Sequence, residues 1–317
     1  MKDFFLVVNP TAAGNRVEKI WTDQIKPKID SKLDYDFEFT SRIGHALELS
    51  QQKANEGYKV ICSVGGDGTA NEVINGVLKA EKKSTFSAFT VGTGNDIPTV
   101  FGIPEGDIDA IIESLINGQD KKFDVGYCIN ADRYFGGVAS MGFDAEVADR
   151  ANKGVKKWRG KGNYQRAIFT TILKFKPYDI VIEPNTGPLV TGPRMLVAIA
   201  NGKRYGAGMH ICPDADPNDN LFHGTTLRKI SRFSLLRLFP RTYDGSHLTH
   251  PAIETFEGNI IKVDSPKRKC LYQVDGDILG YLPETFITKP NFLTVRVPDP
   301  WISYADIWEE TLAEKKK

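Results

Sequence analysis

The segment 63–72, Ser-Val-Gly-Gly-Asp-Gly-Thr-Ala-Asn-Glu, places an acid among three glycines, between a β-branched run and a helix-like run. Glycine lets the backbone turn sharply, and the unpaired N–H groups at the start of a helix favour an anion such as a nucleotide phosphate. Asp67 suits that setting if it holds Mg²⁺, because magnesium prefers oxygen ligands. The segment therefore predicts phosphate binding around Asp67, by Gly65, Gly66, Gly68 and Thr69.

A simpler interpretation stands beside this one. The segment could be an ordinary strand-to-helix turn, and Thr69 with Glu72 has the Thr-x-x-Glu spacing of a capping box, in which both residues only start the helix. Contact of Thr69 and Glu72 with a nucleotide is the alternative.

Three further turns of the first half carry suitable residues. In an open α/β sheet, ligands collect at the carboxyl ends of the strands, and each of these turns follows a strand-like run. The residues that we expect to face a nucleotide there are Asn9, Pro10 and Gly14 in the first turn, Thr40 in the second, and Gly92, Thr93, Gly94 and Asn95, followed by Asp96, in the third. Two glycine-rich turns with an acid in one sheet are much more specific than one.

Length and composition indicate what kind of protein carries these turns. A chain of 317 residues exceeds the usual single-domain size, which predicts two domains. With 41% hydrophobic and 26% charged residues and a net charge of +1, it has the composition of an ordinary globular protein. No apolar stretch has the length of a membrane span and no signal sequence is recognisable, so we expect a cytoplasmic protein. The four cysteines are widely separated, which favours reduced core residues.

The chain changes character near residue 125. Before it, strand-like runs alternate with helix-like runs, which predicts a parallel sheet covered by helices; the strands are expected at 4–8, 35–39, 59–64 and 88–91, and the helices at 17–31, 45–55, 71–78 and 108–116. After it, strands predominate, as in a β-sandwich, with helix-like runs only at 164–175 and 231–239. Residues 301–317 again look helical, with an apolar side that could dock on either domain. We therefore expect domains at 1–125 and 126–297 and a helical tail at 298–317.

Taken together, these motifs resemble the diacylglycerol kinase catalytic-domain superfamily, which includes bacterial lipid kinases and sphingosine kinases. The resemblance runs from the first strand to about residue 297 and rests on the turns above together with Asp124-Val-Gly126, Gly142-Phe-Asp-Ala145, Asn201-Gly202, Pro213–Asp216 and Asp275-Gly-Asp277. It implies an N-terminal nucleotide domain similar to those of phosphofructokinase and NAD kinase, a C-terminal β-sandwich, and an active site in the cleft between them. It also implies ATP, Mg²⁺ and a lipid alcohol, most plausibly diacylglycerol, as the reactants.

The resemblance assigns roles to four acids. Asp67 resembles the acid that organises Mg²⁺ and the ATP phosphates, while Asp96 and Asp124 resemble two further acids of the same network. Simple helix capping by Asp96 and a position at a strand start for Asp124 are the alternatives. Asp277 stands where bacterial relatives usually carry a glutamate that accepts the proton of the lipid hydroxyl, and it is one methylene shorter. Asp275 is interpreted as structural.

A second departure concerns a structural metal. In Gram-positive relatives a turn holds Mg²⁺ through an aspartate and backbone carbonyls, which corresponds here to Asp219, the Leu221 carbonyl and Asp216. Asn220 stands where the family usually has glycine, and asparagine tolerates a positive φ better than most residues.

Two runs rich in Lys and Arg, 150–178 and 228–241, lack acidic residues, and the second is interleaved with apolar ones. Such segments can dock on an anionic membrane, so we expect peripheral association with the inner membrane face; a solvated helix face is the alternative. No nucleic-acid-binding motif accompanies the charge. Some relatives pair through their C-terminal domains, which makes a homodimer an open expectation.

Two other functions stay open from the sequence. NAD kinases also carry Gly-Gly-Asp-Gly-Thr, although the second glycine turn and Asp275-Gly-Asp277 favour lipid kinases. A catalytically weak lipid-binding protein would account for the two departures, whereas the three acids of the nucleotide domain argue for activity.

Overall fold

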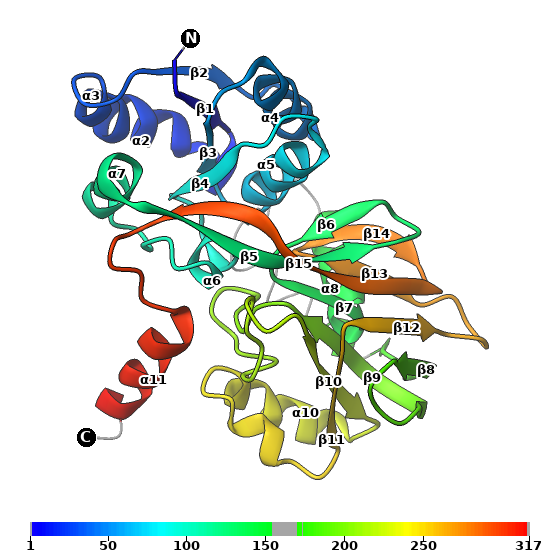
Figure 1. The fold of residues 1–317 in the computed structure, drawn as a ribbon. Coiled ribbons are helices and arrows are strands. Elements are labelled where there is room, and N and C mark those ends of the chain that lie inside the picture. The colour runs from blue at the N-terminus through cyan, green and yellow to red at the C-terminus, as the bar shows by residue number, and fades with distance from the viewer. Residues whose placement is uncertain (1, 154–169, 173, 316–317) are drawn as a thin grey trace. The chain divides into compact units, whose positions relative to one another are not determined.

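The computed structural model describes residues 2–153, 170–172 and 174–315 (Figure 1). The chain divides into two compact units. The first consists of Met1–Val125 and Pro290–Lys317, and the second of Gly126–Lys289. The second unit is thus inserted in the first, and the chain passes from one to the other within strands β5 (Gln119–Cys128) and β15 (Glu284–Val297). The expected boundary at 125 coincides with the division, whereas the end of β15 and the C-terminal segment group with the first unit.

The first unit contains the expected parallel sheet. Its strands run in the order β2-β1-β3-β4-β15, and neighbouring strands pair in parallel. The four that lie entirely in this unit are β1 (Phe4–Val8), β2 (Tyr35–Phe39), β3 (Val60–Gly65) and β4 (Thr85–Thr90). Strands β3 and β4 are buried along their whole length, as expected for central strands of a sheet covered on both faces.

Helices follow the strands of this sheet. They are α1 (Ala12–Asn15), α2 (Val17–Ile20), α3 (Lys26–Ile29), α4 (His45–Glu56), α5 (Asp67–Lys79), α6 (Asp96–Val100), α7 (Ile108–Asn117) and α11 (Tyr304–Lys315). A π-helical turn, Trp21–Ile25, joins α2 to α3, so the helix expected at 17–31 is interrupted. Helices α4 and α5 pack against each other (Figure 1).

The second unit is built mainly of antiparallel strands. In the order β14-β13-β7-β9-β8-β12-β15 they form one run, and β10 and β11 continue from β9. Their bounds are β6 (Arg133–Phe135), β7 (Val138–Gly142), β8 (Tyr178–Pro184), β9 (Val190–Ala200), β10 (Phe222–Arg228), β11 (Ile253–Gly258), β12 (Ile260–Asp264), β13 (Leu271–Val274) and β14 (Asp277–Tyr281). The expected β-rich second half is confirmed.

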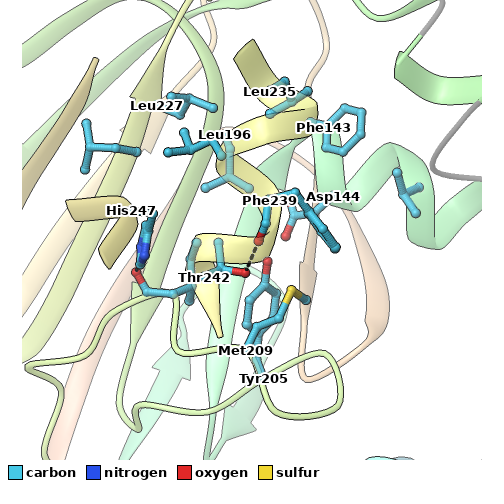
Figure 2. Close-up of a pocket in the computed structure, with 14 residues that line it drawn as sticks. Phe143, Asp144, Leu196, Tyr205, Met209, Leu227, Leu235, Phe239, Thr242 and His247 are labelled. Carbon is cyan, nitrogen blue, oxygen red and sulfur yellow. Dashed lines mark hydrogen bonds between the residues drawn. The ribbon is translucent and has the colours of Figure 1, made fainter. Parts of the chain in front are cut away.

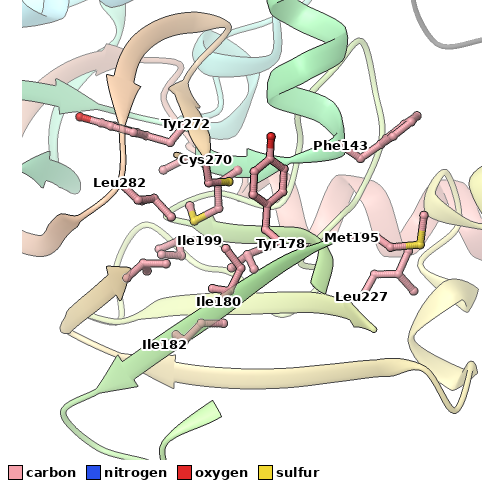
Figure 3. Close-up of a cluster of buried hydrophobic side chains, with 14 of the residues drawn as sticks. Phe143, Tyr178, Ile180, Ile182, Met195, Ile199, Leu227, Cys270, Tyr272 and Leu282 are labelled. Atoms are coloured by element: carbon pink, nitrogen blue, oxygen red, sulfur yellow. The ribbon is translucent and has the colours of Figure 1, made fainter. Parts of the chain in front are cut away.

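Among the described residues this unit has two named α-helices, α8 (Phe143–Lys153) and α10 (Arg232–Leu238), and two 3₁₀ turns, η3 (Phe239–Thr242) and η4 (Ser246–Thr249). Alternate residues of β7, β8 and β9 form a buried apolar core with Phe143 and Tyr178 (Figure 3). Most of the helix expected at 164–175 lies outside the described residues.

The cysteines and the C-terminal segment can also be compared with expectation. All four cysteines are buried and none forms a disulfide. In the C-terminal segment, Trp301 packs on Phe123, and its Nε1 donates to the Phe101 carbonyl at 3.1 Å. Of the apolar side expected there, Ile302 and Ile307 are exposed, whereas Ala305, Trp308 and Leu312 are partly buried. In the described part of the chain, no helix has the length and apolar character needed to span a membrane.

Candidate active site

The segment around Asp67 is a tight strand-to-helix turn. Strand β3 ends at Gly65, Gly66 is the extended N-cap residue, and α5 begins at Asp67. Thr69 therefore lies inside the helix, and no side chain caps its start. The capping box at Thr69 and Glu72 is wrong, because the helix begins three residues earlier than that motif requires.

The two glycine-rich turns touch through their backbones. A Cβ atom on Gly92 would lie 2.5 Å from the Cα of Gly66, so a side chain there would force the turns apart. The second turn is closed by Asn95, which has a left-handed φ of 54° and whose Oδ1 accepts from the Gly92 N–H at 2.9 Å. Thr93 is exposed at its tip. The two turns therefore lie side by side at one edge of the sheet, in contact at Gly66 and Gly92.

Two carboxylates converge beside this contact. A Cβ on Gly94 would lie 2.6 Å from Asp67 Oδ2 and 3.4 Å from Asp96 Oδ2, so both acids face the same side of Gly94. Asp67 Oδ1 accepts from the Ile97 N–H at 3.0 Å, which ties the start of α5 to α6. Asp67 is half-buried and Asp96 is buried. Carboxylate oxygens gathered at the start of a helix suit Mg²⁺ and a phosphate.

Asp124 lies in the same unit and is almost fully buried on β5. Its Oδ1 accepts from the Asn291 N–H at 2.7 Å, where Asn291 has a left-handed φ of 51°. This bond fastens β5 to β15, a task that sequence reasoning did not foresee for Asp124.

Asn9 links the first turn to the turn of Asp67. Its Nδ2 donates to Thr69 Oγ1 at 2.9 Å, and its Oδ1 accepts from both the N–H and the hydroxyl of Thr11. Pro10 lies between these two partners. Beyond it, Ala13, Gly14 and Asn15 have consecutive positive φ values of 50°, 73° and 67°. Asn9 thus orients a hydroxyl, Thr69, that is expected to face the nucleotide.

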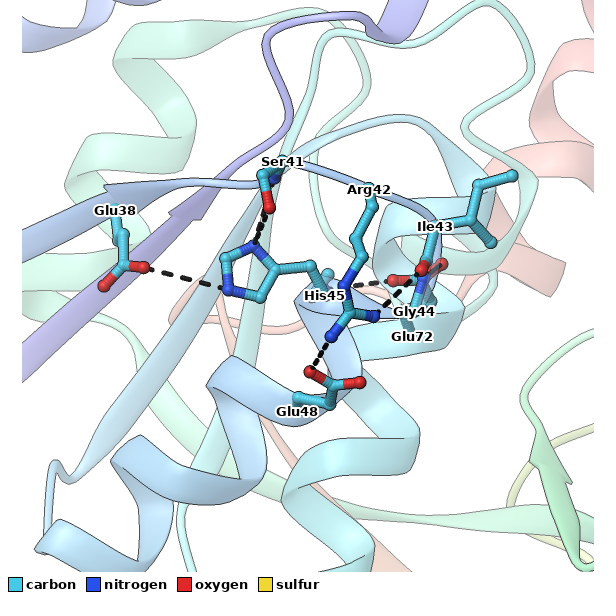
Figure 4. Close-up of polar contacts among 9 residues, drawn as sticks. Glu38, Ser41, Arg42, Ile43, Gly44, His45, Glu48 and Glu72 are labelled. Carbon is cyan, nitrogen blue, oxygen red and sulfur yellow. Dashed lines mark hydrogen bonds and ion pairs between the residues drawn. The ribbon is translucent and has the colours of Figure 1, made fainter.

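The second turn gives Glu72 a structural task. Glu72 Oε1 accepts from the Gly44 N–H at 3.0 Å and Oε2 from the Ala46 N–H at 3.1 Å, so Glu72 caps α4 from the neighbouring helix α5 (Figure 4). Thr40 lies at the end of β2, and its N–H donates to the Val8 carbonyl. The Ser41 N–H donates to His45 Nδ1 at 3.0 Å, which makes Nδ1 the unprotonated nitrogen of the neutral ring.

The Asp275-Gly-Asp277 element belongs to the second unit. Asp275 accepts three backbone N–H bonds, from Gly136, Gly137 and Val138, at 3.0–3.1 Å. Its interpretation as structural is confirmed. Asp277 is about half exposed and its Oδ2 lies 3.1 Å from Arg133 Nη2. This ion pair favours the ionised carboxylate, which is the form that can accept a proton.

The turn expected to hold a structural Mg²⁺ is held by other contacts. Asp216 Oδ1 accepts from the N–H and the amide of Asn218, and Asp219 accepts from the Leu221 N–H at 2.9 Å and contacts His223 Nε2 at 2.8 Å. The hydrogen bond to Asp219 raises the pKa of His223. Over the described ranges, no three His, Cys, Asp or Glu side chains gather as metal ligands. A structural Mg²⁺ at Asp216, Asp219 and Leu221 stays a prediction; in this structure Asp219 contacts an imidazole and a backbone N–H group.

Sequence reasoning did not foresee an apolar cavity in the second unit. It is lined by residues of α8, β9, β10, α10 and the 3₁₀ turns, among them Phe143, Leu196 and Leu235 (Figure 2). The room inside it for water-sized molecules is about 60 Å³, so the cavity is small. Its lining comes from segments far apart in the chain, so no local sequence pattern could have predicted the cavity.

Comparison with known proteins agrees with this geometry. Residues 3–128 match the model of the diacylglycerol kinase catalytic domain, and residues 137–297 match that of the YegS C-terminal NAD kinase β-sandwich-like domain. The chain is 27% identical to the diacylglycerol kinase of Bacillus subtilis over 94% of this chain and 97% of that protein. It is 28% identical to the diacylglycerol kinase of Mycobacterium tuberculosis over 80% and 81% of the two chains.

Solved structures show the same fold. The structure described as a diacylglycerol kinase from Bacillus anthracis superposes with a TM-score of 0.70 at 16% identity, covering 95% of this chain and 98% of that one. A second structure from that organism gives a TM-score of 0.74 at 20% identity, with coverage of 94% and 98%. Because the two family models together span nearly the whole chain, the protein belongs to the diacylglycerol kinase catalytic-domain superfamily and is a kinase of the diacylglycerol kinase type.

Proposed function

We propose that the protein transfers the γ-phosphoryl group of ATP to the hydroxyl of a lipid alcohol, diacylglycerol or a related lipid. The observation that carries the proposal is the convergence of Asp67 and Asp96 beside the Gly66–Gly92 backbone contact. The two acids lie after the carboxyl ends of β3 and β4, and α/β sheets bind nucleotides at such ends. The curated relatives named diacylglycerol kinase support the choice of acceptor.

In this proposal the first unit binds the nucleotide. Backbone N–H groups of the two glycine turns hold the phosphates, and Thr69, oriented by Asn9, adds a hydroxyl. Asp67 and Asp96 hold Mg²⁺, which neutralises charge on the transferring group. Asp67 is kept in position by the Ile97 N–H. Phosphoryl transfer depends mostly on such positioning and charge neutralisation.

Asp277 accepts the proton of the lipid hydroxyl in this proposal. Its ion pair with Arg133 keeps the carboxylate ionised, and its partial exposure leaves it open to an acceptor. Its side chain is one methylene shorter than glutamate, so the acceptor hydroxyl comes closer to the backbone or reaches Asp277 through a water.

We further propose that the chain meets its acceptor at an anionic membrane, through α10 and its flanks. Phe233 and Leu236 are exposed on α10, and the Arg237 guanidinium lies 4.2 Å from the centre of the Phe233 ring. Exposed apolar side chains among Arg and Lys suit an interface that carries negative charge. The other basic run, 150–178, lies largely outside the described residues.

One assay tests the function. Purified protein is incubated with Mg-ATP and mixed micelles of diacylglycerol, a sphingoid base, ceramide or polyprenol, and separately with NAD; products are identified by mass. We expect a phosphorylated lipid and no product from NAD. Phosphorylation of NAD alone, or of nothing in the panel, would overturn the proposal.

Sedimentation with vesicles of phosphatidylcholine, with and without phosphatidylglycerol, tests the membrane step. We expect binding only to the anionic vesicles, and a loss of several-fold for a variant with Phe233→Ser and Arg237→Gln. Lys262→Gln, which removes an exposed charge on β12, is the matched control. Equal binding of both variants and the wild type would remove α10 from the proposal.

A further inference from the structure

Asp277, the proposed proton acceptor, directly follows a two-residue turn. Strands β13 and β14 are joined by Asp275 and Gly276, whose positive φ values of 48° and 92° are those of a type I′ turn. The register then shifts between Tyr272 and Gln273, so only two residue pairs of the ladder lie between the turn and this irregularity. The regular ladder next to the turn is therefore short, and irregularities of this kind are frequent beside active sites.

A buried side chain holds the second residue of this turn. Gln273 is 5% exposed, and its Oε1 accepts from the Gly276 N–H at 2.6 Å. The side chain of Asp275 ties the first turn residue to the N–H groups of residues 136–138. Each residue of the turn thus has its own side-chain contact, and the contact made by Gln273 is the one next to Asp277.

Water could satisfy the Gly276 N–H, because Gly276 is exposed. In a two-residue turn the closing hydrogen bond joins the residues on either side, so this N–H lies outside the ladder. Burying the amide of Gln273 costs free energy unless both of its ends are bonded. A buried amide that bonds an N–H which water could reach therefore points to a task beyond satisfying that N–H.

The other end of the Gln273 amide is fixed as well. Because Oε1 must face the Gly276 donor, Nε2 lies on the far side of the amide, where it donates to the Ser140 hydroxyl. Gln273 and Ser140 are directly paired residues of β13 and β7, and Ser140 is fully buried. Asp144 lies beside them: burial raises the pKa of its carboxyl to about 6, and Ser140 and Gln273 act against this. The orientation of the amide is thus set from both ends.

We propose that Gln273 is a positioning residue for phosphoryl transfer: through the Gly276 N–H it fixes the turn that carries Asp277, and Ser140 holds the Gln273 amide in the required orientation. The inference rests on the proposed function and deepens it. Because the side chain of Asp277 is short, its carboxylate reaches a hydroxyl from a narrow range of backbone positions, and a displaced turn slows the reaction. Gln273 touches neither reactant and acts only through Asp277.

Steady-state rates with Mg-ATP and the best acceptor of the lipid panel test this role. Gln273→Met keeps the length of the side chain but removes both polar atoms. We expect kcat to fall about tenfold, a part of what a general base contributes, with an unchanged KM for Mg-ATP. Ser140→Ala leaves the Gly276 bond in place and should fall between this variant and the wild type. Thr226→Val is the matched control, because it removes another buried side-chain hydrogen bond of this unit, to the Leu196 carbonyl, and should keep the wild-type kcat.

A double-mutant cycle with Asp277→Ala separates positioning from folding. If Gln273 acts only through Asp277, Gln273→Met lowers kcat when Asp277 is present and leaves it unchanged in the Asp277→Ala background. A general loss of folding lowers kcat in both backgrounds. Equal fractional losses in the two backgrounds, or a wild-type kcat in Gln273→Met, would overturn the proposal.

Hydrogen exchange measures the hold on the turn without the reaction. We expect the Gly276 amide to exchange about tenfold faster in Gln273→Met than in the wild type or in Thr226→Val. If no lipid is phosphorylated but this exchange depends on Gln273, the proposed function fails and the positioning of the turn by Gln273 stands. If lipid is phosphorylated but Gln273→Met has the exchange rate and the kcat of the wild type, the inference fails and the function stands.

Discussion

Asp67 in the first unit and Asp275 in the second both directly precede a glycine, yet their surroundings differ. Asp275 accepts three backbone N–H bonds, which hold the start of β7. Asp67 accepts from Ile97, and it lies with another acid, Asp96, on the same side of Gly94. Two acids on one side of a turn repel each other unless a cation joins them. The partners of an acid, more than the motif around it, separate a structural role from a chemical one.

The largest expected effect is on Asp67. Asp67→Asn keeps the shape of the side chain and the bond to Ile97 but removes the charge that would face the proposed Mg²⁺. We expect a loss of activity of roughly a thousandfold, the scale of one lost electrostatic contact to a transition state, with an unchanged melting temperature. Steady-state assays and thermal melting check this, and wild-type turnover in the variant would remove Asp67 from the site.

Asp275 should behave in the opposite way. Asp275→Asn replaces one acceptor oxygen with an NH₂ group that faces backbone N–H donors, so we expect a loss of roughly 3 kcal/mol in the free energy of unfolding. Denaturant unfolding measures it, and the variant's remaining folded fraction should bind Mg-ATP normally. A stable but inactive variant would contradict the contrast with Asp67.

Asp144 gives a third case, because both of its oxygens are buried and burial outweighs the nearby donors Ser140 and Gln273 in setting its pKa. Burial raises its pKa to about 6 in the folded chain, against about 4 when unfolded. The folded state therefore binds the proton more tightly, and stability falls as pH rises from 4 through 6. Asp144→Asn carries no such charge, so we expect it to be more stable than wild type by about 2 kcal/mol at pH 7.5, with the difference vanishing near pH 4. Denaturant unfolding across this range checks the sign.

The smallest effect concerns His223 and Asp219. Their hydrogen bond raises the pKa of His223 above its ordinary value, so the stabilisation is fully present below about pH 6.5 and is lost as pH rises through the raised value. His223→Gln should remove this dependence while changing stability by less than about 1 kcal/mol. Melting curves between pH 6 and 9 with and without added Mg²⁺ measure it. If Mg²⁺ raises the melting temperature of the wild type but not of a variant without the Asp219 carboxylate, the predicted structural Mg²⁺ site at Asp219 is supported.

The sequence predicts the first unit well because its signals are local. Strands β1 and β2 have the predicted bounds, since each is a short apolar or aromatic run between turn residues. Helix α5 begins at Asp67, four residues before the predicted start at Asn71. The prediction missed this first turn because it contains Gly68, and glycine has a low helix propensity. Strand β5 was missed because it begins with Gln-Asp-Lys-Lys, a polar run without an apolar pattern.

In the candidate site, too, local features could be predicted from the sequence and long-range contacts could not. The meeting of the two glycine turns could be predicted, because parallel strands end at one edge of a sheet. The bond from Asp124 to Asn291 and the caps that Glu72 provides for α4 could not, since each joins segments far apart in the chain. Asp144 is plain in the sequence, but the burial of its carboxylate is a property of the folded unit alone.

The insertion of the second unit has a consequence for biosynthesis. A ribosome delivers residues from the N-terminus, so β4 leaves it about two hundred residues before the part of β15 that pairs with it, at Val295 and Phe86. The second unit, Gly126–Lys289, is contiguous and emerges complete in that interval. The first unit therefore finishes its sheet last, although it begins first, and a truncated chain that ends before β15 would expose the edge of β4 to other chains.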